Sequence, residues 1–135
     1  MALAALIVAG FAIYRGNRNT SAATVVGLNE AFRQAWERFL PATGTNRRHQ
    51  LSELMNLLEI ASAIHLEGSL AGVSDDLVKD YLNSVLRLLI GDSYSESEIP
   101  TLLEDPKTFI YIKKFMNRRS ELSVTIPTKW YESYK

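Results

Sequence analysis

Residues 51–69 read LSELMNLLEIASAIHLEGS. Apolar side chains recur in this stretch at intervals of three and four, the spacing that places them on one face of an α-helix. Leu57 and Ile60 widen this face, and Gly68 is a favourable helix stop. We therefore predict a helix over 48–67 that is the most buried of the chain. Its main stripe consists of Leu51, Leu54, Met55, Leu58, Ala61 and Ile64 or His65.

One helix is predicted before this segment and another after it. The stretch 22–39 repeats apolar residues at the same intervals and is followed by the helix breaker Pro41. Ser74 precedes two aspartates, and these residue types cap a helix start and match its dipole, so a helix is predicted over 75–90. We expect this helix to bury Leu77, Val78, Tyr81, Leu82, Val85, Leu88 and Leu89.

Shorter elements are predicted after Gly91. Residues 92–98 are polar and acidic and are interpreted as an exposed loop. Pro100 can open a short helical turn, and Pro106 another helix over 107–119. Together these segments predict an all-α fold: a small bundle of about four to five helices that comes after a membrane-spanning or membrane-associated N-terminal helix.

The N-terminal segment 2–14 has no charged residue, and Arg15 and Arg18 come directly after it. Basic residues after an apolar run favour a cytoplasmic position for the C-terminal part of the chain. We expect residues 1–15 to be a single-pass anchor in the plasma membrane, with the helical domain in the cytoplasm. As a helix the first fourteen residues span roughly 21 Å, short of the ~30 Å hydrocarbon core. A soluble core helix and a signal peptide are the alternatives.

Small residues in the anchor segment point to helix association. Ala5 and Ala9 stand four residues apart, with Gly10 beside them. Small side chains at this spacing let membrane helices approach closely. This face is therefore predicted to associate with another copy or with a partner helix.

The rest of the chain divides into a juxtamembrane linker at 16–21, a helical domain at 22–119 and a tail at 120–135. Trp130, Tyr131 and Tyr134 cluster near the end of this tail. Aromatic rings of this kind sit well at the membrane–water interface, so the cluster is a candidate interface. Packing on the domain or on a partner chain is the alternative.

The charge distribution is uneven although the net charge is zero. Residues 1–48 carry +4, residues 49–112 carry −8 and residues 113–135 carry +4. Zero net charge argues against a dedicated nucleic-acid binder, whereas basic ends fit contact with an anionic lipid surface. The absence of cysteine excludes disulfides and thiol catalysis.

Few residues fit a chemical role. Asn56 and Glu59 lie three residues apart on an otherwise apolar helix. We interpret them as a structural polar pair that hydrogen-bonds across a helix interface, with Tyr81 or Arg87 as partner; an acid or base with a raised pKa is the alternative. His49 and Glu53 share a helix face that we expect to be solvated.

No catalytic pattern emerges from the sequence. Nothing spaces serine, histidine and aspartate as a triad, and no glycine-rich loop is present to hold phosphate. The sequence predicts no enzyme, no cofactor and no metal site, and activity through Glu59 is the weakest alternative.

The stretch 51–69 resembles an uncharacterised bacterial family of small membrane-anchored helical proteins. Asn56, Glu59 and Ala61 match a pattern of the form LN-x-x-E-x-A, although Met55 replaces the leucine. The resemblance covers most of the chain and implies an N-terminal transmembrane helix with a helical domain. Proteins similar to this family can lie among prophage or anti-phage defence genes, and no activity is established for the family.

Two functions are expected on these grounds. The first is a membrane-tethered adaptor that assembles with another protein subunit or with itself, as part of a larger bacterial membrane-associated assembly that serves anti-phage defence. The second is an effector that oligomerises through the N-terminal helix and perturbs the bilayer.

Overall fold

A computed structural model describes residues 21–70 and 72–135 of the chain. The predicted anchor at 1–15, with Ala5, Ala9, Gly10, Arg15 and Arg18, lies outside these residues. None of the helices described is long and apolar enough to cross a membrane.

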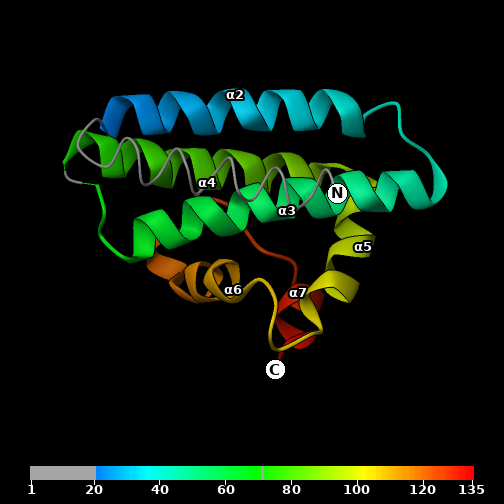
Figure 1. The fold of residues 1–135 in the computed structure, drawn as a ribbon. Coiled ribbons are helices and arrows are strands. Elements are labelled where there is room, and N and C mark those ends of the chain that lie inside the picture. The colour runs from blue at the N-terminus through cyan, green and yellow to red at the C-terminus, as the bar shows by residue number, and fades with distance from the viewer. Residues whose placement is uncertain (1–20, 71) are drawn as a thin grey trace.

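The described residues form an all-α bundle without strands, as predicted (Figure 1). Its six α-helices are joined by short loops and one 3-10 turn. The elements are α2 (Ser21–Phe39), α3 (Gly44–Leu66), α4 (Val73–Gly91), α5 (Ser93–Leu103), α6 (Ile110–Asn117), η1 (Arg119–Glu121) and α7 (Thr128–Glu132).

Helix α3 occupies the centre of the bundle. It contacts α2, α4, α5 and α6. Figure 1 shows α2 on one side of α3 and α4, with the shorter helices on the other side. Eleven residues of α3 are buried, the largest number in any described helix, so the prediction of a most buried helix here is confirmed.

The turn between α3 and α4 makes these two helices antiparallel neighbours. Gly68 has φ +64°, a left-handed conformation that glycine adopts without strain. Its N–H donates to the carbonyl of His65, which closes the helix end as predicted. Helix α4 starts after Gly72 rather than at Ser74. Because α2 and α4 each run opposite to α3, they run in the same direction as each other (Figure 1).

The predicted loop at 92–98 is wrong, because α5 begins at Ser93. Asp92 caps it: the carboxylate accepts the Ser95 N–H at 3.0 Å and the Ser95 hydroxyl at 2.7 Å. Ser95, Ile99 and Leu103 then recur at intervals of four and are buried. The exposed face of α5 carries the polar residues. Their number made residues 92–98 polar and acidic in composition, and this composition led to the prediction of a loop.

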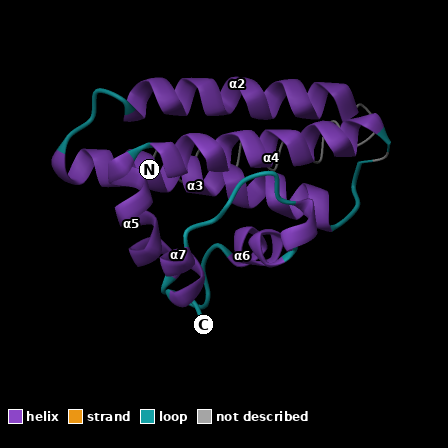
Figure 2. Cartoon of the chain, turned by 180° about the vertical axis from the view of Figure 1, so that it is seen from behind, coloured by secondary structure: helices purple, strands orange, loops and turns teal. Residues whose placement is uncertain are grey.

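Pro100 lies inside α5 and not at the start of a turn. Proline has no N–H, so the carbonyl four residues earlier, that of Glu96, loses its helical donor. The indole Nε1 of Trp130 donates to this carbonyl at 3.0 Å. Trp130 is fully buried, so α7 is held against α5 and the stretch 120–135 packs on the domain. Figure 2 shows the loop after η1 leading to α7 beside α5.

Candidate functional site

A groove of about 370 Å³ lies between α2 and α4, the two helices that run in the same direction. Its walls are mainly apolar, and it is open to solvent. The lining residues are Val25, Asn29 and Phe32 from α2, and Leu77, Asp80, Tyr81, Ser84, Val85 and Leu88 from α4.

The groove exists because α4 carries two apolar stripes. One stripe, which includes Val78, Leu82 and Leu89, is buried against the rest of the bundle. The second faces the groove, where Leu77 is 44% and Leu88 is 47% exposed. Our prediction that both of these leucines are buried is therefore wrong. The described neighbours of α4 therefore leave part of its apolar surface uncovered.

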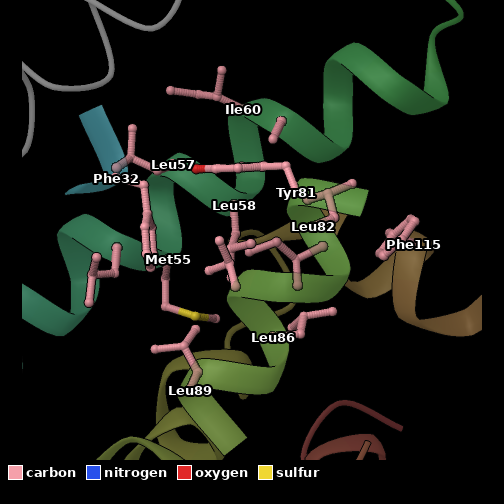
Figure 3. Packing of buried hydrophobic residues seen from close by; sticks show 14 of the residues in the cluster. Phe32, Met55, Leu57, Leu58, Ile60, Tyr81, Leu82, Leu86, Leu89 and Phe115 are labelled. Atoms are coloured by element: carbon pink, nitrogen blue, oxygen red, sulfur yellow. The ribbon is translucent and has the colours of Figure 1, made fainter. Parts of the chain in front are cut away.

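The floor of the groove is well packed. Tyr81 extends from α4 toward Leu57 and Phe32 (Figure 3). Its ring meets that of Phe32 edge to face at 6.1 Å between centroids, a favourable geometry for aromatic pairs. The Tyr81 hydroxyl finds no hydrogen-bond partner among the described residues, and burial raises the pKa of this phenol. The floor is therefore packed and largely apolar, as expected of a binding groove that is already formed.

The end of the groove at the start of α4 is acidic. Asp76 and Asp80 are exposed there, and Asp80 itself lines the groove. Exposed apolar residues continue beyond the lining: Val26 on α2 is 67% exposed and Val73 on α4 is 74% exposed. An apolar face with an acidic end suits an apolar helix whose neighbouring charges are positive.

Glu59 lies outside the groove and has a structural role. Its two carboxylate oxygens accept the N–H groups of Ile112 at 2.8 Å and of Tyr111 at 3.2 Å. These are the first amides of α6, which starts after a left-handed Phe109 with no capping bond of its own. Glu59 is thus the cap of another helix, which explains why α6 begins at residue 110 and not at 107.

The partners predicted for Glu59 are wrong. Arg87 donates instead to Ser123, and Tyr81 points into the floor of the groove. Asn56 donates to the carbonyl of Ser52 within α3 at 2.9 Å, so it serves its own helix. The prediction that Glu59 hydrogen-bonds across a helix interface is confirmed. The donors are backbone N–H groups, however, and not a side chain.

A second polar cluster surrounds His65. Its Nδ1 lies 2.8 Å from Asp75 and its Nε2 lies 2.6 Å from Glu121, so the ring joins α3, α4 and η1. Burial tends to raise the pKa of Glu121, but the bonds from His65 and Arg118 outweigh it and lower this pKa below its usual value. The His65 ring is buried and its two partners are partly exposed, so the cluster acts as a clamp between three elements.

The expectation of a solvated face holds for His49, which is exposed, but is wrong for Glu53. Glu53 is only 1% exposed. Its carboxylate lies 3.5 Å from His49 Nε2 and 3.7 Å from Arg38 Nη2, both of which are about half exposed. Arg38 and His49 therefore cover a buried carboxylate at the contact of α2 with α3.

The predicted aromatic interface divides into two parts. Trp130 is inside the core, so the alternative prediction, packing on the domain, is correct for this residue. Tyr131 and Tyr134 are partly exposed, and the Arg119 guanidinium lies 4.1 Å from the centre of the Tyr131 ring. Tyr131 also donates to the carbonyl of Met116 at 2.8 Å. These tyrosines hold the C-terminus on α6 rather than forming an open patch.

Sequence reasoning did not find the groove, although a signal for it is present. Leu77, Tyr81 and Leu88 form one helical stripe while Val78, Leu82 and Leu89 form another, and a single contact cannot bury both. No protein-family model, curated protein or solved structure matches this chain.

Proposed function

We propose that this protein is a membrane-tethered interaction module whose α2/α4 groove binds an apolar or amphipathic helix. The observation that carries this proposal is the open apolar groove, with Leu77 and Leu88 exposed on a helix whose other apolar stripe is buried. Grooves of this kind receive the apolar face of a partner helix. The tether is residues 1–15, expected from the apolar run and the Arg15 and Arg18 that come after it.

The adaptor role is favoured because the described residues offer a binding surface, while the polar groups singled out above have structural roles. Glu59 caps a helix and His65 is clamped between carboxylates. Neither group lines the groove. The family resemblance alone supports a place in a bacterial defence assembly. A partner helix would be sought among the other proteins of such an assembly.

Leu88→Asp tests the groove, and Leu40→Asp is its matched control. Leu40 is 53% exposed at the end of α2, away from the groove, so both variants place a charge at a leucine of similar exposure. Each full-length variant is purified from its own cells in detergent, and the proteins that accompany it are compared by mass spectrometry. We expect the Leu88 variant to lose a partner that the Leu40 variant keeps. Equal retention by both would refute the groove as the binding surface.

The tether is tested separately by membrane fractionation. The full chain should remain with membranes after an alkaline carbonate wash, and a chain lacking residues 1–15 should be released. If both chains fractionate in the same way, the anchor is wrong.

A further inference from the structure

We infer that the partner helix is α4 of a second copy of this chain, packed antiparallel on the exposed face of α4 around Ser84. This inference rests on the proposed function in one respect, that the face of α4 beside the groove binds a helix. It adds the identity of that helix and the direction in which it binds.

The exposed face of α4 carries two strips side by side. Leu77 and Leu88 are 44% and 47% exposed and form an apolar strip. Asp80 and Arg87 are exposed and form a charged strip. At about 3.6 residues per turn, residues seven or eleven positions apart lie within ~20° of each other around a helix, so each strip runs along α4. By the same geometry the exposed Ser84 lies between the two strips.

The charged strip is complementary to itself in one direction only. Asp80 lies toward the start of α4 and Arg87 toward its end. When two α4 helices pack antiparallel, Asp80 of each copy faces Arg87 of the other, and the symmetry makes two equivalent ion pairs. A parallel arrangement would bring Asp80 against Asp80 and Arg87 against Arg87. The charges therefore select the antiparallel arrangement.

The two strips have nearly the same centre along the helix. The midpoint of Asp80 and Arg87 falls between residues 83 and 84, and that of Leu77 and Leu88 falls between residues 82 and 83. These midpoints are one residue apart, about 1.5 Å. A two-fold axis beside Ser84, passing between the copies at right angles to both helices, therefore aligns the leucine strips while it pairs the charges.

The residues at this contact suit it. Ser84 has a small side chain, and small residues at a contact let two helices approach closely. Asp80 makes no ion pair within the described part of the chain. Arg87 donates from Nη2 to the carbonyl and the hydroxyl of Ser123, at 3.2 Å each. Because a guanidinium has five N–H donors, its bonds to described residues leave donors for a carboxylate of the other copy.

A second copy is favoured over an unrelated helix because α4 supplies both halves of the match. The partner helix needs an apolar strip beside a charged strip, with a cation opposite Asp80 and a carboxylate opposite Arg87. Antiparallel α4 provides all of these at the required spacing. Every favourable contact then occurs twice, as in other two-fold interfaces.

Cysteine cross-linking tests the position of the axis, because the chain contains no cysteine of its own. Ser84→Cys places a thiol at the axis, where it meets its counterpart. Gln34→Cys is the matched control, since Gln34 is exposed on α2 and does not line the groove. Both full chains are purified in the same nonionic detergent, oxidised mildly and followed on non-reducing gels.

We expect the disulfide-linked dimer to form about tenfold or more faster for Ser84→Cys than for Gln34→Cys, because the contact holds only the first pair of thiols together. Equal rates for the two variants would overturn the inference. Association through residues 1–15 would not imitate the expected result, since it brings neither position to a two-fold axis on α4.

Charge reversal tests the direction of packing. In the Ser84→Cys chain at low ionic strength, Asp80→Arg and Arg87→Asp each turn two attractive pairs into two repulsive ones, so each alone should cross-link about fivefold or more slowly. A mixture of the two variants restores both pairs between unlike copies and should form the mixed dimer at about the parent rate. A size tag on one variant identifies that dimer. Glu37→Arg, at an exposed site on α2, is the control and should keep the parent rate.

A mixture that cross-links as slowly as either variant alone would overturn the antiparallel contact. The comparison of Ser84→Cys with Gln34→Cys does not involve Arg87, so it remains decisive if the loss of the bonds to Ser123 unfolds the Arg87→Asp chain.

This outcome is separable from that of the proposed function. Equal cross-linking rates, together with another protein that is lost on Leu88→Asp, keep the interaction module and overturn only the second copy. Fast cross-linking of Ser84→Cys, together with equal retention of other proteins by the Leu88 and Leu40 variants, supports the second copy and refutes the groove as a site for any other protein.

Discussion

Trp130→Phe should destabilise the fold by an amount that depends on Pro100, although the two residues lie 30 positions apart. Pro100 leaves the Glu96 carbonyl without its helical donor, and the Trp130 indole replaces that donor at 3.0 Å. Phenylalanine keeps part of the packing in this buried site but has no N–H. The carbonyl then lies in a largely apolar contact without a partner.

The expected loss has two parts. A buried carbonyl that loses its partner costs about 1–3 kcal/mol. The smaller ring adds about 1 kcal/mol, less than the 3–5 kcal/mol typical of removing a buried tryptophan side chain entirely. Pro100→Ala supplies a new backbone N–H four residues after Glu96, so the first part should largely disappear in that background. The coupling between the two substitutions should therefore be about 1–2 kcal/mol.

Urea unfolding of four proteins measures this coupling: the parent chain, each single variant and the double variant, with linear extrapolation of the free energy of unfolding. The loss from Trp130→Phe should be clearly smaller when residue 100 is alanine. An equal loss in both backgrounds, within about 0.5 kcal/mol, would show that the indole bond does not substitute for the donor that proline lacks.

Three further predictions use the same denaturation assay. Glu59→Ala removes the cap of α6 and should lower the free energy of unfolding by about 2 kcal/mol. Glu59→Gln should have a smaller effect, and the exposed control Glu37→Ala should cost less than about 0.5 kcal/mol. A larger loss for Glu59→Gln than for Glu59→Ala would contradict a hydrogen-bonding role. Tyr81→Phe removes a hydroxyl without a described partner and should leave stability unchanged or raise it by about 1 kcal/mol, so a clear loss would mean that the hydroxyl is bonded. Because the folded pKa of Glu121 lies below its usual 4.5, this carboxylate stabilises the fold above that pH and ceases to do so as the pH falls through the folded value. Glu121→Gln should therefore be less stable than the parent at pH 7, and the difference should shrink as the pH is lowered below 4.5; a difference independent of pH would refute the clamp with His65.

Much of the fold was predictable from residues 22–91. The intervals of three and four in 51–64 and the stop at Gly68 depend on local geometry, and the structure confirms a central helix there. α5 was missed because its apolar stripe is narrow: Ser95, Ile99 and Leu103 are buried while acidic and hydroxyl side chains dominate the composition. Composition alone therefore indicated a loop where the Asp92 cap and a helical period were present.

The polar residues were harder to place, because their partners are distant in sequence. Glu59 bonds amides more than fifty positions away, and His65 bonds Glu121 across a similar separation. A carboxylate on an apolar helix face signals that some partner exists. It does not say whether the partner is a side chain on α4 or the free amides at the start of α6.

Sequence by itself determined that the described part is helical, that α3 is its centre and that segment 2–14 has no charge, because these properties depend on residue type and on periods of a few positions. Only the tertiary structure decided that Trp130 enters the core, that Glu59 caps α6 and that the second apolar stripe of α4 remains open beside α2. A helix shows in its sequence that a face is apolar. Which neighbour covers that face depends on how the other helices fill the space around it.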